Sequence, residues 1–254
     1  MPEFMWYDLL TTDMDAAAAF YHAVTGVTAL PAQDDMPYRV LTVERAGIGG
    51  MMPLSPEMQA AGMRPCWMGY VGVEDVDAEA ARLQKEGGTL HRPPETVPGI
   101  VRFAVVSDPQ GTGFMLLKGL SAEPFQPPPK NALGTVTWHE LHAVDGNTAL
   151  DFYQLMFGWH QVMDHDMGPM GVYRLFAVAG SQEPVGGMMT KMAAVPQPFW
   201  LFYTLVEAID AACERVKAHG GQIANGPHEV PGGNWVAQCI DPQGAMFALV
   251  ATKR

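Results

Sequence analysis

The sequence predicts an α+β fold built from four βαβββ modules, two in each half of the chain. Short motifs of the first half return in the same order in the second half. Within each half, the order of one strand, one helix and three strands occurs twice, and each half is long enough for a core of its own. We expect each pair of modules to form a curved, mostly antiparallel sheet around a cavity.

Paired motifs carry the repeat. The first half contains Trp6-Tyr-Asp-Leu, Phe20-Tyr21, Tyr38-Arg39, Gly49-Gly-Met-Met52, Gly87-Gly88 and Asp108-Pro-Gln-Gly111. The second half contains Trp138-His-Glu-Leu, Phe152-Tyr153, Tyr173-Arg174, Gly186-Gly-Met-Met189, Gly220-Gly221 and Asp241-Pro-Gln-Gly244. A repeat of this length indicates two copies of one domain.

The first module begins with a predicted strand at residues 4–10. Asp13 is a suitable N-cap, and the apolar spacing after it predicts a helix that ends at Gly26. Short strands are expected at residues 38–43 and 47–53, with turn residues between them.

The second module begins with a predicted strand at residues 67–73. Asp75 is expected to cap a helix over residues 76–86, which ends at Gly87-Gly88. Strands are expected near residues 89–92, 101–106 and 113–118, and the Asp108-Pro-Gln-Gly111 motif predicts a tight turn between the last two.

The second half repeats this pattern. Between the halves, Pro124 and Pro127-Pro-Pro129 are typical of a stiff, exposed linker. We therefore predict a first domain at residues 1–118, a Pro-rich linker at 119–135 and a second domain at 136–254.

Composition excludes several classes of partner. The formal net charge is −12, which repels phosphate backbones and anionic lipid, so we expect neither nucleic-acid nor membrane binding. No apolar stretch approaches the roughly 20 residues that a membrane span needs. The three cysteines show no zinc-type spacing, and together with the absence of a secretion signal they favour the cytoplasm.

The chain holds 18 methionines, many of them in clusters. They are either flexible core filler or a polarizable lining for an apolar ligand.

The order of the modules and of the repeated motifs resembles the vicinal oxygen chelate superfamily, which contains glyoxalase I, bleomycin-resistance proteins, fosfomycin-resistance enzymes and extradiol dioxygenases. The resemblance covers nearly the whole chain. It implies two glyoxalase-like domains, and the opening Trp-x-Asp/Glu-Leu of each half looks like a bacterial two-domain subgroup. Single-domain relatives commonly dimerise, so we expect either a monomer with an internal pseudo-dimer or a homodimer.

The resemblance also implies where a divalent metal would be bound. The positions that correspond to the superfamily's His and Glu ligands carry side chains unsuited to such a metal. They are Trp6, Met68, Met115 and Met51-Met52 in the first half, and Trp138, Leu201, Ala248 and Met188-Met189 in the second. We therefore expect no metal and no other cofactor.

Strand alternation places Trp138, Glu140 and His142 on one face, as it does Trp6, Asp8 and Leu10 in the first half. Glu140 and His142 are our candidates for acid/base catalysis. The carboxylates could equally be structural or anchor a polar group of a ligand, and a metal site at Glu140 and His142 with His139 or His165 is a further alternative.

The favoured function is binding of a small, largely apolar or aromatic molecule in cavities lined by Met, Trp and Tyr. The expected ligand-binding residues are Trp6, Asp8, Met52, Met68, Tyr70, Met115, Trp138, Met189, Leu201 and Tyr203. The alternatives are a glyoxalase-like lyase or isomerase, or a dioxygenase-related or tailoring enzyme, that uses Glu140 and His142, and a purely structural scaffold.

Overall fold

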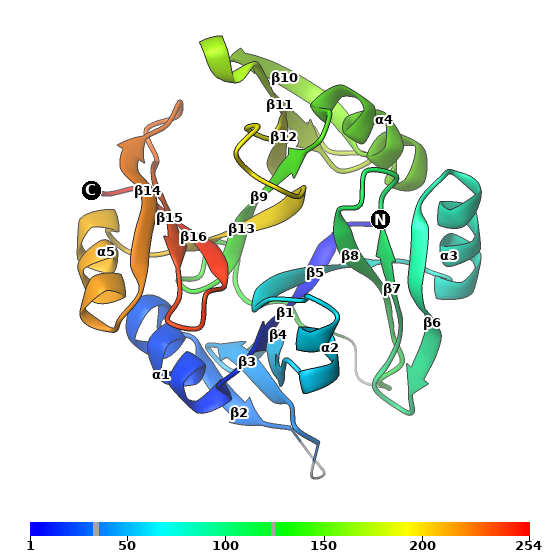
Figure 1. Cartoon of the computed structure of the whole chain (residues 1–254), viewed down its shortest axis with the longest axis horizontal. Coiled ribbons are helices and arrows are strands. Elements are labelled where there is room, and N and C mark those ends of the chain that lie inside the picture. The colour runs from blue at the N-terminus through cyan, green and yellow to red at the C-terminus, as the bar shows by residue number, and fades with distance from the viewer. Residues whose placement is uncertain (33–35, 123–124) are drawn as a thin grey trace. The chain divides into compact units, whose positions relative to one another are not determined.

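The computed structural model describes residues 1–32, 36–122 and 125–254, and these residues form two eight-stranded mixed sheets (Figure 1). The first sheet has the order β2 (Thr28–Pro31), β3 (Arg39–Val43), β4 (Ala46–Pro53), β1 (Phe4–Thr11), β5 (Cys66–Gly72), β8 (Gly113–Gly119), β7 (Val101–Ser107), β6 (Thr89–Val97). The second has the order β10 (His160–Asp166), β11 (Val172–Ala177), β12 (Gly186–Thr190), β9 (Val136–Ala143), β13 (Phe199–Leu205), β16 (Met246–Ala251), β15 (Trp235–Ile240), β14 (Gln222–Glu229). The predicted α+β class with four modules is confirmed.

The sheets are antiparallel in their outer strands and parallel near their centres. In the first sheet β1 pairs in parallel with β4, and β5 with β8. In the second sheet β9 and β12, and β13 and β16, do the same. The first and last strands of a module therefore run side by side in one direction, which brings their side chains together on one face.

The helices follow the capping signals of the sequence. They are α1 (Met14–Thr25), α2 (Pro56–Ala60), α3 (Val76–Lys85), α4 (Gly146–Phe157) and α5 (Ile209–Ala218), with a 3₁₀ turn η1 (Gly168–Met170). Asp13 accepts hydrogen bonds from two backbone N–H groups of α1, and Gly26 ends this helix with a φ of 79°, in the left-handed region. Helix α5 differs because its N-cap residue, Ala208, makes no side-chain hydrogen bond.

The structure contains elements that the periodicity did not reveal. Strand β2, helix α2 and the turn η1 are short and only weakly patterned. Strand β6 runs to Val97, well beyond the expected end at residue 92, with irregular pairing opposite Arg92. In the predicted linker, residues 123–124 lie outside the described residues, and residues 120–122 and 125–135 contain no helix or strand.

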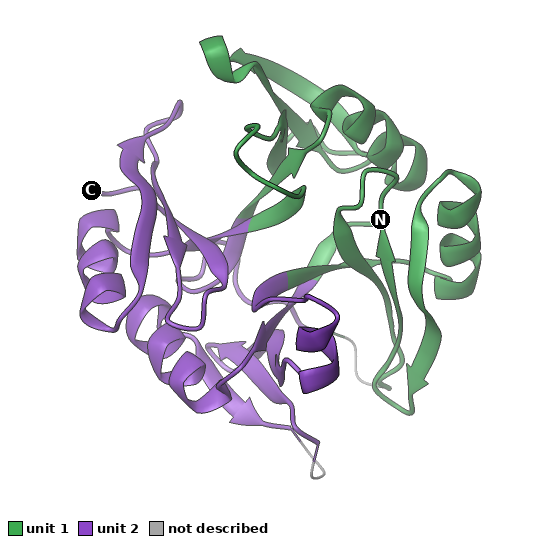
Figure 2. Cartoon of the chain, in the orientation of Figure 1, with its two compact units in different colours: residues 1–5, 68–125, 138–201 green, residues 6–67, 126–137, 202–254 purple. Residues whose placement is uncertain are grey.

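The chain divides into two compact units, each of which combines modules from both halves of the sequence (Figure 2). Unit 1 contains residues 1–5, 68–125 and 138–201, and unit 2 contains residues 6–67, 126–137 and 202–254. The chain thus forms an internal pseudo-dimer. The first module of the first half combines with the second module of the second half, and the two middle modules combine with each other.

Each unit has its own core. In unit 2, the buried faces of α1 and α5 form one core, in which Phe20 of α1 clusters with residues such as Leu9 and Phe247. In unit 1, the core is an aromatic cluster in which Trp159 stacks on Tyr153 and Phe176. Within the described residues, no helix has the length and hydropathy required to cross a membrane.

Candidate functional site

In unit 2, a closed hydrogen-bond network surrounds the carboxylate of Asp8. The Trp6 indole Nε1 donates to Asp8 Oδ1 (2.9 Å) and to the Tyr38 hydroxyl oxygen (3.0 Å). The Tyr38 hydroxyl donates in turn to Asp8 Oδ1 (2.8 Å). Burial and the neighbouring Asp8 carboxylate raise the pKa of Tyr38 above its usual value, so the hydroxyl keeps its proton and remains a donor.

Two glycines of β4 make room for this network. Gly50 lies opposite Asp8 in the parallel register, and a Cβ there would overlap the Tyr38 hydroxyl and crowd Asp8 Oδ1. A Cβ on Gly49 would overlap the backbone carbonyl oxygen of Tyr7. Tyr38 can therefore pack closely against the sheet because glycines occupy both positions of this pair.

Unit 1 contains a related network, built from the second half of the sequence. The Trp138 indole Nε1 donates to the Tyr173 hydroxyl oxygen (2.8 Å), and the hydroxyl donates to Glu140 Oε2 (3.0 Å). Gly187 lies opposite Glu140, and a Cβ there would overlap the ring of Tyr173. The repeated Trp, Tyr, Gly-Gly and carboxylate motifs thus converge on one local structure in both halves.

The network in unit 1 includes one further residue, His142. His142 Nε2 lies 2.7 Å from Glu140 Oε1, and the His142 ring stacks on Phe199 with a centroid distance of 4.6 Å and an interplanar angle of 7°. Met189 lies beside His142 in the parallel register. The side chains of His142 and Glu140 keep 13% and 11% of their surface exposed, so neither is completely enclosed by the protein.

Sequence reasoning assigned no role to Tyr38, Tyr173 or Phe199. The recurrence of Tyr-Arg and of Gly-Gly in both halves was the signal for the two tyrosines, because a hydroxyl repeated with a repeated carboxylate is a candidate hydrogen-bond pair. Nothing in the pattern around Phe199 indicates its stacking with His142.

The predicted ligand-binding residues fall into both units. Trp6, Asp8, Met52 and Tyr203 belong to unit 2, whereas Met68, Tyr70, Met115, Trp138, Met189 and Leu201 belong to unit 1, together with Glu140 and His142. Within unit 2, Met52 is the register neighbour of Leu10. Within unit 1, Tyr70 is the register neighbour of Met115. The structure thus brings Trp6 together with Asp8, and Trp138 together with Glu140 and His142, while the role of all these residues stays a prediction.

The side chains at the positions where the resemblance predicts metal ligands do not fit a divalent metal. Methionine offers a soft thioether, and tryptophan, leucine and alanine offer no metal-binding atom. Among the residues that the structure describes, no group of three or more His, Cys, Asp or Glu side chains could hold a metal ion. His139, considered as a third ligand beside Glu140 and His142, instead bonds through Nδ1 to the Val185 carbonyl (2.8 Å) and stacks on Phe4.

Burial of His139 lowers its pKa to about 4. The imidazole is therefore neutral over the physiological pH range and belongs to the core of unit 1.

The two Asp-Pro-Gln-Gly turns link the halves within each unit. Tyr21, of the first half, donates to Asp241 Oδ2 (3.0 Å), of the second half. Tyr153, of the second half, donates to Asp108 Oδ2 (3.2 Å), of the first half. The other oxygen of each aspartate accepts backbone N–H groups of its own turn. These buried carboxylates are structural, and the Phe-Tyr motif of each helix supplies the tyrosine that reaches across.

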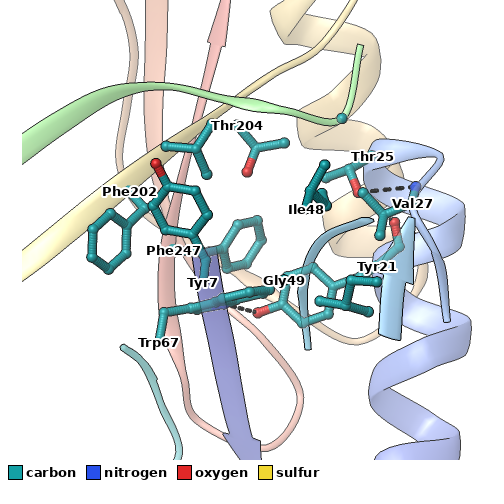
Figure 3. Close-up of a pocket in the computed structure, with 13 residues that line it drawn as sticks. Tyr7, Tyr21, Thr25, Val27, Ile48, Gly49, Trp67, Phe202, Thr204 and Phe247 are labelled. Atoms are coloured by element: carbon teal, nitrogen blue, oxygen red, sulfur yellow. Dashed lines mark hydrogen bonds between the residues drawn. The ribbon is translucent and has the colours of Figure 1, made fainter. Parts of the chain in front are cut away.

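A small cavity lies in unit 2 (Figure 3). Its volume of about 30 Å³ is enough for roughly two water molecules. The Tyr21 hydroxyl, which accepts from Trp67 Nε1 (2.9 Å), lies at its wall with Thr25 and Phe247. None of the predicted ligand-binding residues lines this cavity.

The sequence matches a family model over residues 4–116 and 136–249, which is the Glyoxalase/Bleomycin resistance protein/Dioxygenase superfamily. The chain belongs to this superfamily. The match covers both halves of the chain, in agreement with the resemblance carried by the repeated motifs, and confirms the two tandem domains of the sequence.

Curated relatives align over nearly the full length of this superfamily member. A Mycobacterium tuberculosis protein named "Putative glyoxylase CFP32" is 31% identical over 253 residues, covering 96% of this chain and 93% of the relative. The Anthracycline biosynthesis protein DnrV of Streptomyces peucetius is 29% identical over 260 residues, and DauV of a Streptomyces strain is 30% identical over 266 residues. In both cases the alignment covers 96% of this chain and 91% of the relative.

Solved structures share the fold at low sequence identity. The Mn(II)-bound glyoxalase from Novosphingobium aromaticivorans has a TM-score of 0.68 and 16% identity, and covers 100% of this chain and 84% of its own. Homoprotocatechuate 2,3-dioxygenase from Brevibacterium fuscum has a TM-score of 0.69 and 14% identity, covering 100% of this chain and 82% of its own. These likenesses establish the tandem fold alone.

Proposed function

We propose that this protein binds a small, largely apolar or aromatic molecule through the faces that carry the two carboxylate networks, without the divalent metal usual in its superfamily. One observation carries the proposal. A buried carboxylate that accepts from a tyrosine hydroxyl, with a tryptophan indole donating to that tyrosine, is found at the same strand position in both halves, whereas the positions where the resemblance predicts metal ligands carry Trp, Met, Leu and Ala.

The surroundings of each carboxylate favour an aromatic ligand. Trp6, Tyr38 and Met52 in unit 2, and Phe199 in unit 1, are only partly buried and offer ring faces and a polarizable thioether. A buried carboxylate beside such surfaces accepts a hydrogen bond from a ligand hydroxyl or amine and fixes the ligand's orientation. Two relatives are named for anthracycline biosynthesis, which supports planar aromatic molecules as the first ligands to test.

A ligand-induced shift in melting temperature tests the proposal. Metal-free wild-type protein is mixed with a hydroxylated anthraquinone, and separately with an anthracycline. At a ligand concentration about 100-fold above Kd, binding adds about 2.7 kcal/mol of stability, which corresponds to a rise of roughly 5–10 °C in a protein of this size.

Two variants assign the effect to the networks. Combined in one chain, Asp8→Asn and Glu140→Gln are expected to lose most of the ligand-induced shift, because an amide replaces the anionic acceptor of each face. Asp164→Asn, which removes one exposed carboxylate from β10, is the matched control and should keep the shift. If neither compound changes the melting temperature, and the two variants only destabilise, the carboxylates are structural and the scaffold alternative stands.

A second candidate function is catalysis by Glu140 and His142. The 2.7 Å contact between His142 Nε2 and Glu140 Oε1 favours it, because a carboxylate that holds an imidazole is a common arrangement for proton transfer. An assay of hemithioacetal isomerisation, with and without added Ni²⁺, Mn²⁺ or Zn²⁺, tests this candidate. Turnover that His142→Leu abolishes would support it, and turnover that needs stoichiometric metal would contradict the metal-free proposal.

A further inference from the structure

Three coordinated differences separate the two copies of the network. Leu10, Asp8 and Cys66 of the first half correspond to His142, Glu140 and Phe199 of the second half. The longer side chain of Glu140 reaches His142, and Phe199 stacks on the imidazole of His142. The second half therefore has an imidazole together with both side chains that fix its position, and the first half has none of the three.

The hydrogen bonds of the second network fix its direction. The Trp138 indole can only donate, so it occupies a lone pair of the Tyr173 oxygen. The Tyr173 hydroxyl proton is then directed to Glu140 Oε2. The ionised carboxylate of Glu140 is an acceptor at both oxygens, so His142 must donate its Nε2–H to Oε1.

This arrangement determines which nitrogen of His142 is a base. With the proton on Nε2, the neutral imidazole carries its acceptor lone pair on Nδ1. Among the residues that the structure describes, Nδ1 of His142 makes no hydrogen bond. The stack with Phe199 holds the ring plane, and therefore the direction of this lone pair.

We propose that His142 Nδ1 is the proton acceptor for an acidic O–H group of the ligand, such as a phenol, and that Glu140, Tyr173 and Trp138 are positioning residues that fix its tautomer. The inference deepens the proposed function, because it assigns a phenolic ligand to the face in unit 1. When the phenolic proton moves to Nδ1, the O–H electron pair remains on the phenolate oxygen, and the Glu140 carboxylate balances the imidazolium charge.

The same reasoning assigns a different role to the first half. Leu10 has no nitrogen, and Asp8 receives its donors from Trp6 and Tyr38. The network in unit 2 can anchor a polar group but cannot accept a proton through an imidazole. Proton transfer through an imidazole is thus confined to unit 1.

Nitrogen NMR of the histidine rings tests the inference without any known substrate. In ¹⁵N-labelled wild-type protein at about pH 9, where an ordinary imidazole is neutral, we expect His142 to show a protonated Nε2, with an exchange-protected downfield ring proton, and an unprotonated Nδ1. Titration with phenol should shift the Nδ1 resonance. Anisole, which has the same ring but no O–H donor, should leave that resonance unchanged.

Four variants provide the assignment and the controls, and two of them exchange residues between the halves. His142→Leu should remove the resonances. Glu140→Gln should move the ring proton upfield, because the charge-assisted bond is lost, and Tyr173→Phe should weaken its protection from exchange. Leu10→His places an imidazole at the equivalent site without its partners, should show no protected ring proton, and stays informative if His142→Leu fails to fold.

Two results would overturn the inference. One is a protonated Nδ1 in the free wild-type protein, and the other is an equal response of His142 to phenol and anisole. Either result leaves the proposed function intact if the hydroxylated anthraquinone still raises the melting temperature. Conversely, a correct tautomer without any shift by the anthraquinone or the anthracycline contradicts the proposed function and not the tautomer.

Discussion

Single residues explain why certain motifs occur in both halves. The Gly-Gly pairs at residues 49–50 and 186–187 could be predicted from the sequence only as turn or strand residues. The structure shows that they are needed because a tyrosine ring lies directly on the second glycine of each pair. Such a contact joins residues of different strands, and no local pattern records it.

The close contacts of Gly50 and Gly187 with tyrosine rings predict how an added methyl group changes stability. Gly50→Ala and Gly187→Ala should each lower the free energy of unfolding by about 1–3 kcal/mol, because the tyrosine must move away from its carboxylate. Chemical denaturation measures the loss. Gly119→Ala, where a Cβ would meet nothing within 4 Å, should change stability by less than about 0.5 kcal/mol. Equal losses of stability at the three positions would show that the tyrosines do not require the space left by Gly50 and Gly187.

His139 predicts a pH dependence of stability. Its pKa is lowered from the usual 6.5 to about 4 by burial, so the unfolded chain binds a proton more readily than the folded protein between these values. Stability is therefore complete above pH 6.5 and is lost as the pH falls towards 4, by up to roughly 3 kcal/mol from this group. His139→Phe should flatten the curve of unfolding free energy between pH 6.5 and 4. An unchanged slope would show that His139 can be protonated in the folded state.

At the scale of elements, most strands and helices follow from alternation and capping signals. Asp13 and Asp75 cap their helices as predicted, and Trp138, Glu140 and His142 share one strand face as alternation requires. Helix α2 and the turn η1, which were not predicted, and strand β2, which was expected only from the module order, are too short for a periodic pattern to form.

The uncapped helix α5 gives a prediction from the repeat itself. Ala208 stands where the first half has Asp75, whose side chain accepts from the Ala78 backbone N–H (3.0 Å). Ala208 has an extended backbone that suits a cap, so Ala208→Asp should raise the free energy of unfolding by about 0.5–2 kcal/mol. Asp75→Ala should lower it by a similar amount, and urea denaturation of both variants checks the pair. A destabilising Ala208→Asp would show that the capping site is not equivalent.

For the whole molecule, the sequence predicted two domains in tandem, and the family match covers both halves. The compact units nevertheless combine modules of both halves. The repeat could not predict this combination, because equivalent modules present equivalent surfaces and the pattern does not record which pairs pack together.

Double-mutant cycles test this pairing of modules. Tyr21→Phe and Asp241→Asn belong to different halves but to one hydrogen bond, and so do Tyr153→Phe and Asp108→Asn. Each pair should show a coupling energy of about 0.5–3 kcal/mol. Tyr21 and Asp108, which belong to the same half, should be additive to within about 0.5 kcal/mol. Coupling within halves and additivity between them would contradict the unit boundaries.

We propose that this superfamily member holds an aromatic ligand by carboxylates instead of by a metal. Native mass spectrometry tests it most directly, on protein purified with Ni²⁺, Mn²⁺ and Zn²⁺ present and then mixed with the hydroxylated anthraquinone. We expect the mass of the metal-free chain plus the ligand, with the adduct lost when Glu140→Gln and Asp8→Asn are combined in one chain. One tightly bound metal ion per chain, whether or not it is lost when the two carboxylates are replaced, would contradict it.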